Sequence, residues 1–452
     1  MTERGQPWLP FLGALLAAAW VCVHFDAPLV EDSLFWWIPK AIKAGEAGFP
    51  LSPSGTLPAA MGSDLLHQTT IPQWSDGLPD YGHPPLWYWW IGLWSTVLGP
   101  SLSTIRLATL LPAMAAGAGF VALGRRLGNG IAGFAIFAVP PFLAQLLRPE
   151  LDLGLIAVVP WVLIALLDRA WGRFAILSAL AVGIKEPGVL LVVPAILTAH
   201  QERRFRVAAL TPLIVLGGWA WLHGGLAQPE RLPDGIFGWT TDLFTVLFIV
   251  FITQARFLLL LGIVRFARER ILTSFVVIWI LFFATVGFFA NRGTSDMFTH
   301  VRYLLPGLLV ATVILAQKRP WLASFGLLFL HSSSAFGPEA SMFGIDQARA
   351  EKQAAPWIKS QIDAGETIWV GTHQAAALSQ SWAGVVTKPI KDLEVYGMST
   401  HSNDINAGDI VLETAYGEPS GAILTGREKT KIMDWNTHDG RVVAWRINDE
   451  AG

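Results

Sequence analysis

Long apolar stretches separated by short polar runs fill the first three quarters of the chain. An α-helix rises 1.5 Å per residue, so about 20 apolar residues cross the roughly 30 Å of hydrocarbon in a bilayer. On this pattern we predict about eleven membrane-spanning helices, placed at 8–25, 104–123, 131–147, 153–168, 171–184, 187–199, 207–223, 241–263, 271–290, 301–316 and 320–336. The pattern therefore predicts a polytopic α-helical membrane protein.

Arginine and lysine residues between these spans indicate the orientation of the chain. They cluster at 125–126, 169–173, 203–206, 265–270 and 318–319, and such clusters favour the cytosolic side. All of them lie in the cytosol only if the Trp-rich segment 85–98 does not cross the membrane. We therefore predict that 85–98 is an interfacial helix on the outer surface and that the N-terminus is cytosolic.

This topology brings the polar residues of interest to the outer face. They are Glu31, Asp32 and His83 in the first outer loop, 26–84, and then Glu150, Asp152, Lys185, Glu186 and Arg302 at the outer ends of later spans. Ionisable residues at a membrane edge are costly to place there, which makes them candidates for a functional site.

The last part of the chain has a different pattern. Its charge density rises, and short alternating runs predict strands at 367–370, 409–412, 422–424 and 441–447, with helical spacing at 346–362. We predict two domains. Residues 1–337 form the transmembrane domain, and residues 338–452 form a small α/β domain that the topology places outside the cytosol.

Composition supports this class and excludes others. The chain is 53% hydrophobic and 15% charged, against about 25% charged in a soluble domain, and its mean hydropathy is +0.47. A net charge of −2 argues against nucleic acid as a partner. Cys22 is the single cysteine, which excludes an intrachain disulfide. The sequence has no phosphate-binding GxxxxGK[ST] loop, no dinucleotide-binding glycine pattern after a strand and no HExxH zinc motif.

The acidic candidates have both a chemical and a structural interpretation. A carboxylate at Asp32 could act as a general base or hold a metal ion, or it could cap the helix that follows. Asp152 could likewise position an acceptor or bind a metal, or it could cap a helix that starts at Leu153.

The basic candidates are open in the same way. Lys185 could bind a lipid phosphate or pair with Glu186. Arg302 lies at an outer helix end, against the usual inside bias, so it could bind an anion or extend to the headgroups. His83 could contact an anionic headgroup, or its aromatic surroundings could simply be an interfacial anchor.

Six segments of the chain, in this order, resemble one known class of proteins. They are Glu31-Asp32, the run His83-Pro84-Pro85-Leu86-Trp87-Tyr88-Trp89, one span that opens with Ile105-Arg106-Leu107-Ala108 and closes with Gly124-Arg125-Arg126-Leu127-Gly128, then Glu150-Leu151-Asp152, Gly183-Ile184-Lys185 and Arg302-Tyr303-Leu304-Leu305-Pro306. Over residues 8–316 the chain resembles the GT-C class of integral-membrane glycosyltransferases. Within it, the bacterial branch of aminoarabinose transferases and protein O-mannosyltransferase-like enzymes is the most similar.

The resemblance implies an activity and a set of roles. The donor would be a polyprenyl-phosphate-linked sugar, transferred with inversion on the outer face of the bacterial cytoplasmic membrane. Asp32 would be the base with Glu31 beside it, and Asp152 with Glu150 would be the second acid. Lys185, Arg302 and His83 would bind the donor phosphate. Asp32 and Asp152 could share a divalent metal ion.

The family often has Asp-Glu where this chain has Glu-Asp, so either acid could occupy the base position. The acceptor stays open among a lipid, a glycan and a protein. The alternative function is a catalytically silent GT-C-like scaffold or partner subunit of a membrane complex. A transporter is disfavoured because the charged residues lie at helix ends on one face rather than at mid-membrane.

Overall fold

A computed structural model describes residues 6–27, 29, 33, 37–46, 83–200, 206–222, 270–285, 304–318, 343–371, 394–396, 405–414, 427–437 and 440–448. The chain divides into two compact units. The first comprises Met1–Phe25, Asp80–Trp87 and Arg106–Ser341, and the second comprises Asp26–Pro79, Tyr88–Ile105 and Met342–Gly452. The predicted spans 241–263 and 320–336 and the predicted strand 422–424 lie outside the described residues.

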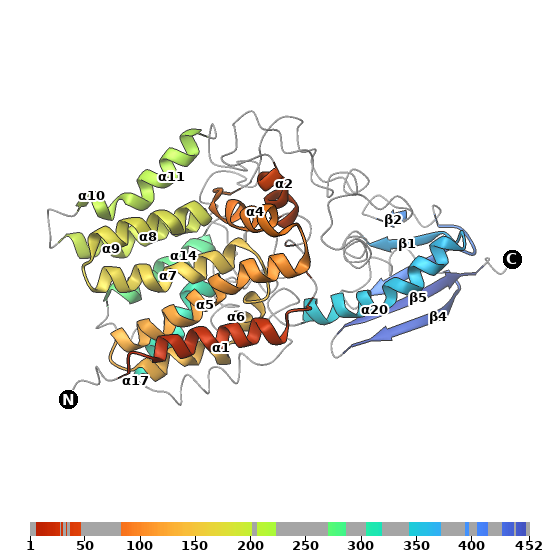
Figure 1. Cartoon of the computed structure of the whole chain (residues 1–452), viewed down its shortest axis with the longest axis horizontal. Coiled ribbons are helices and arrows are strands. Elements are labelled where there is room, and N and C mark those ends of the chain that lie inside the picture. Colours follow the sequence, from red (N-terminus) through yellow and green to blue (C-terminus); the bar gives the residue numbers. More distant parts are fainter. Residues whose placement is uncertain are drawn as a thin grey trace. The chain divides into compact units, whose positions relative to one another are not determined.

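The first unit is helical (Figure 1). Its elements are α1 (Leu9–Val23), α5 (Leu102–Arg126, whose first residues belong to the second unit), the 3₁₀ helix η2 (Gly130–Ala138), α6 (Pro140–Gln145), α7 (Leu151–Leu167), α8 (Trp171–Ile184), the 3₁₀ helix η3 (Glu186–Leu191), α9 (Val192–Ala199), α10 (Arg206–Ala209), α11 (Thr211–Leu222), α14 (Arg270–Thr285) and α17 (Leu305–Lys318).

Helices α7 and α8 form a hairpin that positions most of the candidate residues. They lie alongside each other (Figure 1) and are joined by a turn in which Arg169 has the left-handed φ of 55°. After α8 the chain returns into η3, and Gly188 lies against the backbone of α8. A Cβ at Gly188 would come 2.6 Å from the carbonyl carbon of Ala181, so this close return requires glycine.

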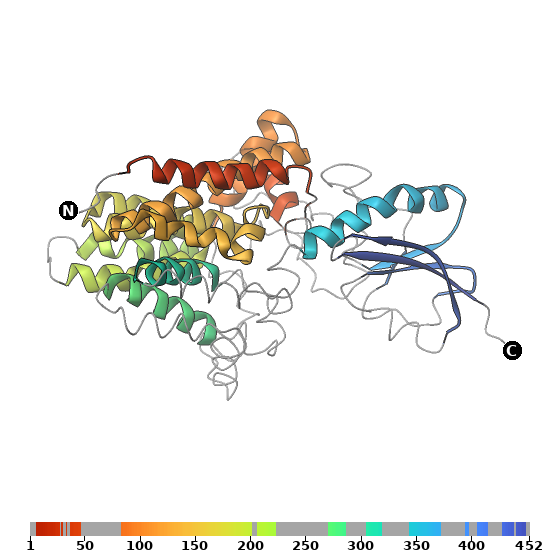
Figure 2. The same ribbon diagram turned by 90° about the horizontal axis from the view of Figure 1, so that it is seen from below.

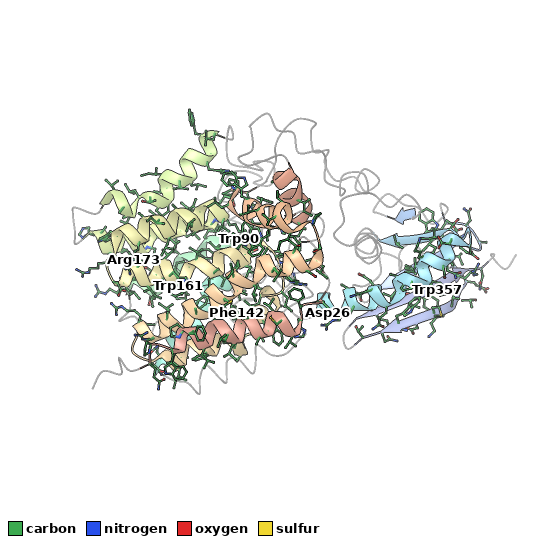
Figure 3. The ribbon with its side chains drawn as sticks, in the orientation of Figure 1. Asp26, Trp90, Phe142, Trp161, Arg173 and Trp357 are labelled. Atoms are coloured by element: carbon green, nitrogen blue, oxygen red, sulfur yellow. The ribbon has the colours of Figure 1, made fainter. Side chains whose placement is uncertain are left out.

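Small and aromatic side chains hold α5 against its neighbours. Gly13 of α1 faces α5, where a Cβ would lie 2.6 Å from the carbonyl oxygen of Gly117. Phe142 packs against Phe120 with ring centroids 6.4 Å apart, and Trp161 Nε1 donates to the Ala115 carbonyl at 3.0 Å (Figure 3). Close approach through small residues is typical of helix packing in membranes.

One helix of the described residues, α5 with 25 residues, is long and apolar enough to cross a membrane by length and composition. Shorter apolar helices in the same described ranges are Leu9–Val23, Leu151–Leu167, Trp171–Ile184, Glu186–Ala199, Thr211–Leu222, Arg270–Trp279 and Leu305–Gln317.

Two predicted spans are not single α-helices. Residues 131–147 form η2 and then α6, because Val139 is extended (φ −97°, ψ 104°) before Pro140, as expected for a residue that precedes proline. Residues 187–199 are helical throughout, as η3 and then α9, because Leu191 and Val192 keep helical angles; Pro187 lies in the first turn of η3. At 139–140, in contrast, a proline interrupts a run that its apolar composition made look continuous.

The segment 85–98 is helical, as predicted, and forms α4 (Leu86–Leu98). In the second unit it packs against α2 (Ile38–Glu46), where a Cβ at Gly45 would lie 2.7 Å from the carbonyl oxygen of Gly92. The ring centroids of Trp37 and Tyr88 lie 6.1 Å apart, which adds an aromatic contact beside this helix pair.

The tail of the second unit is one helix on one face of a five-stranded sheet (Figure 2). The helix is α20 (Phe343–Asp363), and the strands are β1 (Ile368–Gly371), β2 (Glu394–Tyr396), β3 (Ile410–Thr414), β4 (Lys429–Asn436) and β5 (Arg441–Ile447), in the order β2-β1-β3-β5-β4. Strands β2, β1 and β3 are parallel, whereas β3, β5 and β4 are antiparallel.

The tail core lies between α20 and this face of the sheet. Ala350, Ala354 and Ile358 pack on Val370 and Leu412. The predicted helix at 346–362 lies within α20, and three predicted strands coincide with β1, β3 and β5 to within two residues. The alternating pattern missed β2, which is short, and β4, where the apolar residues Ile432 and Met433 are adjacent instead of alternating.

Candidate functional site

Asp152 and Lys185 form an ion pair inside the first unit. Asp152 lies in the first turn of α7, and Lys185 follows α8 directly in an extended conformation (φ −156°, ψ 138°). Lys185 Nζ donates to Asp152 Oδ1 at 2.6 Å. Only 5% of the lysine side chain and 6% of the aspartate side chain are exposed. A buried salt bridge thus connects the start of α7 with the end of α8 at the open end of the hairpin.

This pairing corrects two structural interpretations of the sequence. Asp152 is not the cap of a helix starting at Leu153, because α7 begins at Leu151 and the residue in the cap position is Glu150, which makes no side-chain cap bond. Lys185 does not pair with its neighbour Glu186, because the extended backbone at Lys185 directs the ammonium to α7. Each charge compensates the other, and removing one partner from a buried pair costs about 3–5 kcal/mol.

Glu186 pairs instead with His83. The distance from His83 Nδ1 to Glu186 Oε2 is 2.7 Å, and about a quarter of each side chain is exposed. Two consecutive residues after α8 therefore hold two different segments, the start of α7 and the chain leading into α4.

Glu150 lies in a separate buried contact beside this site. Its side chain is fully buried, with Arg148 3.9 Å away and Gln145 Nε2 donating to Oε2 at 3.3 Å. Arg106 of α5, also fully buried, donates to the Leu147 carbonyl in the same turn. The described contacts of Glu150 thus link it to the loop before α7 rather than to the Asp152–Lys185 pair.

The first residues of α4, Leu86 and Trp87, pack against the end of the hairpin where α7 begins and α8 ends. Trp87 Nε1 donates to the Pro149 carbonyl at 3.0 Å, and a Cβ at Gly154 would lie 2.6 Å from the Trp87 ring. Leu86 lies against Gly183 at the end of α8, where a Cβ would overlap its side chain. These contacts fix the backbone on which His83 is carried.

The structure brings together part of the predicted set. His83, Asp152 and Lys185 are joined through the turn at 185–186, and Glu150 lies two residues from Asp152 in its own contacts. Glu31, Asp32 and Arg302 lie outside the described residues, so their predicted roles stay predictions. Within the described ranges, no group of three His, Cys, Asp or Glu side chains could hold a metal ion.

The sequence indicated His83, Asp152 and Lys185 as site residues but did not predict which side chains pair with them. Residues 152 and 185 lie about equally far from the turn at Asp168–Ala170, so an antiparallel hairpin brings them to the same end. That symmetry was the available signal. Glu186 as the partner of His83, 103 positions away, had no comparable signal.

The chain has an ArnT-like fold. The chain is similar to the crystal structure of ArnT from Cupriavidus metallidurans bound to undecaprenyl phosphate, with a TM-score of 0.53 and 13% identity over 98% of each chain. The apo state of that ArnT gives a TM-score of 0.49 and 13% identity over 96% of this chain and 97% of that one.

No family model and no curated protein sequence matches the chain. The resemblance seen in the six segments is confirmed at the level of the fold. At 13% identity the comparison concerns the fold, and the activity has to be argued from the site.

Proposed function

We propose that the protein is an inverting glycosyltransferase that uses a polyprenyl-phosphate-linked sugar. Transfer would take place on the outer face of the bacterial cytoplasmic membrane, with the N-terminus in the cytosol and residues 338–452 outside. The orientation rests on the basic clusters between the spans. The observation that supports the activity most strongly is the buried Lys185–Asp152 pair in a GT-C fold.

Asp152 has a clear physical role in this proposal. Its carboxylate lies 2.6 Å from the ammonium of Lys185, whose side chain is only 5% exposed, and so compensates that buried charge. An ammonium has three donors, and Lys185 uses one of them in the hydrogen bond to Asp152. The pair would thus hold a positive charge ready at the point where the leaving group develops negative charge.

The reaction then balances as a single displacement. The acceptor oxygen attacks the anomeric carbon from the side opposite the donor phosphate, and the bond from that carbon to the phosphate oxygen breaks. The phosphate leaves with the electron pair, while Asp32 or Glu31 takes the proton of the acceptor hydroxyl. Lys185, Arg302 and His83 would stabilise the departing phosphate. A divalent ion shared by Asp32 and Asp152 would add charge stabilisation, and no step here depends on it.

Transfer from undecaprenyl-phosphate sugars to lipid acceptors, by the purified protein in detergent, tests the proposal. Asp32→Asn should reduce turnover by at least about a hundredfold, since general-base catalysis contributes 10²–10⁴-fold. Lys359→Met, which breaks an exposed pair on α20, is the control and should leave turnover unchanged. Undiminished transfer by Asp32→Asn would exclude Asp32 as the base. No transfer by the wild type to any lipid, glycan or peptide acceptor would favour the scaffold alternative.

A further inference from the structure

Glu186 carries a carboxylate that the proposed reaction does not use. It begins η3 directly after Lys185, yet its partner is His83 rather than the lysine. The contact joins the end of the hairpin to the segment before α4. A carboxylate that binds a histidine ring commonly fixes which nitrogen carries the proton and how the ring is turned.

We propose that Glu186 is a positioning residue for His83: its carboxylate accepts the hydrogen of Nδ1 and so directs Nε2 toward the donor phosphate. The inference rests on the proposed function, because that function supplies the lipid phosphate as the ligand. A carboxylate only accepts hydrogen bonds, so the nitrogen 2.7 Å from it must carry hydrogen. Nε2 is then the ring atom that addresses a group other than Glu186.

The surrounding packing holds the backbone that carries His83. Trp87 donates to the Pro149 carbonyl, and Leu86 lies against Gly183. The Glu186 contact restricts rotation about the side-chain bonds of the histidine. Loss of Glu186 should therefore disturb the ring without moving the helices.

Histidine is the type of side chain whose charge can change in the physiological range, so the test below compares two pH values.

A double-mutant cycle on the full-length protein tests whether Glu186 acts through His83. Binding of undecaprenyl phosphate is measured at pH 6 and pH 8 for the wild type, Glu186→Ala, His83→Ala and the double variant. We expect Glu186→Ala to weaken binding about tenfold at pH 6, the size typical of a lost orienting partner. It should have no further effect in the His83→Ala background. Independent, additive losses would overturn the proposal.

The matched control is Glu366→Ala. It removes a carboxylate that pairs with Arg446 in the tail domain and should leave binding unchanged at both pH values. A loss in this variant equal to that of Glu186→Ala would show a general effect of removing acidic charge and would overturn the proposal.

The tautomer of His83 gives a second readout that needs no ligand. In protein labelled with ¹⁵N-histidine, the His83 signals are identified by their absence from His83→Ala. We expect a protonated Nδ1 in the wild type and a change to the Nε2–H form in Glu186→Ala. An unchanged tautomer would overturn the positioning role. If the tautomer changes but the wild type binds no undecaprenyl phosphate, the proposed function fails and the positioning contact stands.

Discussion

Glu351 on α20 should make the stability of the tail domain depend on pH. Its side chain is buried, and burial raises the pKa of the carboxyl to about 8 from the ordinary 4.5. Gln347 Nε2 donates to Glu351 Oε1 at 3.1 Å, and Gln347 Oε1 accepts from the Arg441 backbone N–H at 3.0 Å. The neutral acid therefore ends a short buried chain of hydrogen bonds that joins α20 to β5.

The size of the effect follows from the two pKa values. The folded domain holds a proton that the unfolded chain releases above pH 4.5, so the contribution to stability is complete below pH 4.5. It falls as the pH rises to about 8 and is constant above that. Each pH unit is worth about 1.4 kcal/mol, so stability should drop by about 3 kcal/mol between pH 5.5 and pH 7.5. Glu351→Gln keeps the acceptor oxygen, and it should remove most of this slope.

Hydrogen–deuterium exchange of the full chain measures this loss. Protection factors for peptides from α20 and β5, corrected for the intrinsic pH dependence of exchange, should fall about a hundredfold from pH 5.5 to pH 7.5. They should change little in Glu351→Gln. Glu366→Gln, at a partly exposed ion pair, should retain the wild-type slope. Equal slopes in the wild type and Glu351→Gln would refute the reasoning.

Three other substitutions give distinct results. Asp434→Asn removes the negative charge and one of the two oxygens that accept hydrogen bonds from Arg441. These bonds hold the pKa of the Asp434 carboxyl well below its usual range; the stability they add is present above about pH 4 and lost in acid, and thermal unfolding at pH 7 should show a loss under about 1 kcal/mol. Gly154→Ala forces a methyl group against the Trp87 ring and should cost about 1–3 kcal/mol in the melting of the helical unit, so an unchanged melting temperature would contradict the packing. Asp152→Asn leaves a buried ammonium without its carboxylate and should cost about 3–5 kcal/mol, and a loss below about 1 kcal/mol would show that the pair is not buried.

Apolar patterning predicted the two helices of the α7–α8 hairpin closely. The predicted span 171–184 coincides with α8, and 153–168 differs from α7 by a residue or two. The apolar run at 131–147 was misjudged, because Val139 is extended before Pro140 and ends the first helical segment irrespective of hydropathy. The run at 187–199 is helical throughout, although its first part is the 3₁₀ helix η3. The tail strands followed their alternation, except for β4, whose exposed edge position tolerates charged residues.

The site shows a different limit of sequence reasoning. His83, Asp152 and Lys185 were found because ionisable residues are rare in apolar surroundings. Their partners depend on how the chain returns on itself, and adjacent charges such as Lys185 and Glu186 suggest a local pair that the backbone does not make. Sequence therefore indicated which side chains belong to the site, while the α7–α8 hairpin determined which of them meet.

Binding of undecaprenyl phosphate to the purified protein is the most direct measurement of the central claim. Native mass spectrometry should detect the lipid on the wild type, and Lys185→Met should reduce the bound fraction at least about tenfold through loss of a charge-assisted contact. The exposed lysine variant Lys359→Met should bind as the wild type does. Equal binding by the wild type and a folded Lys185→Met protein would contradict the assignment of the buried Lys185–Asp152 pair to a lipid-phosphate site.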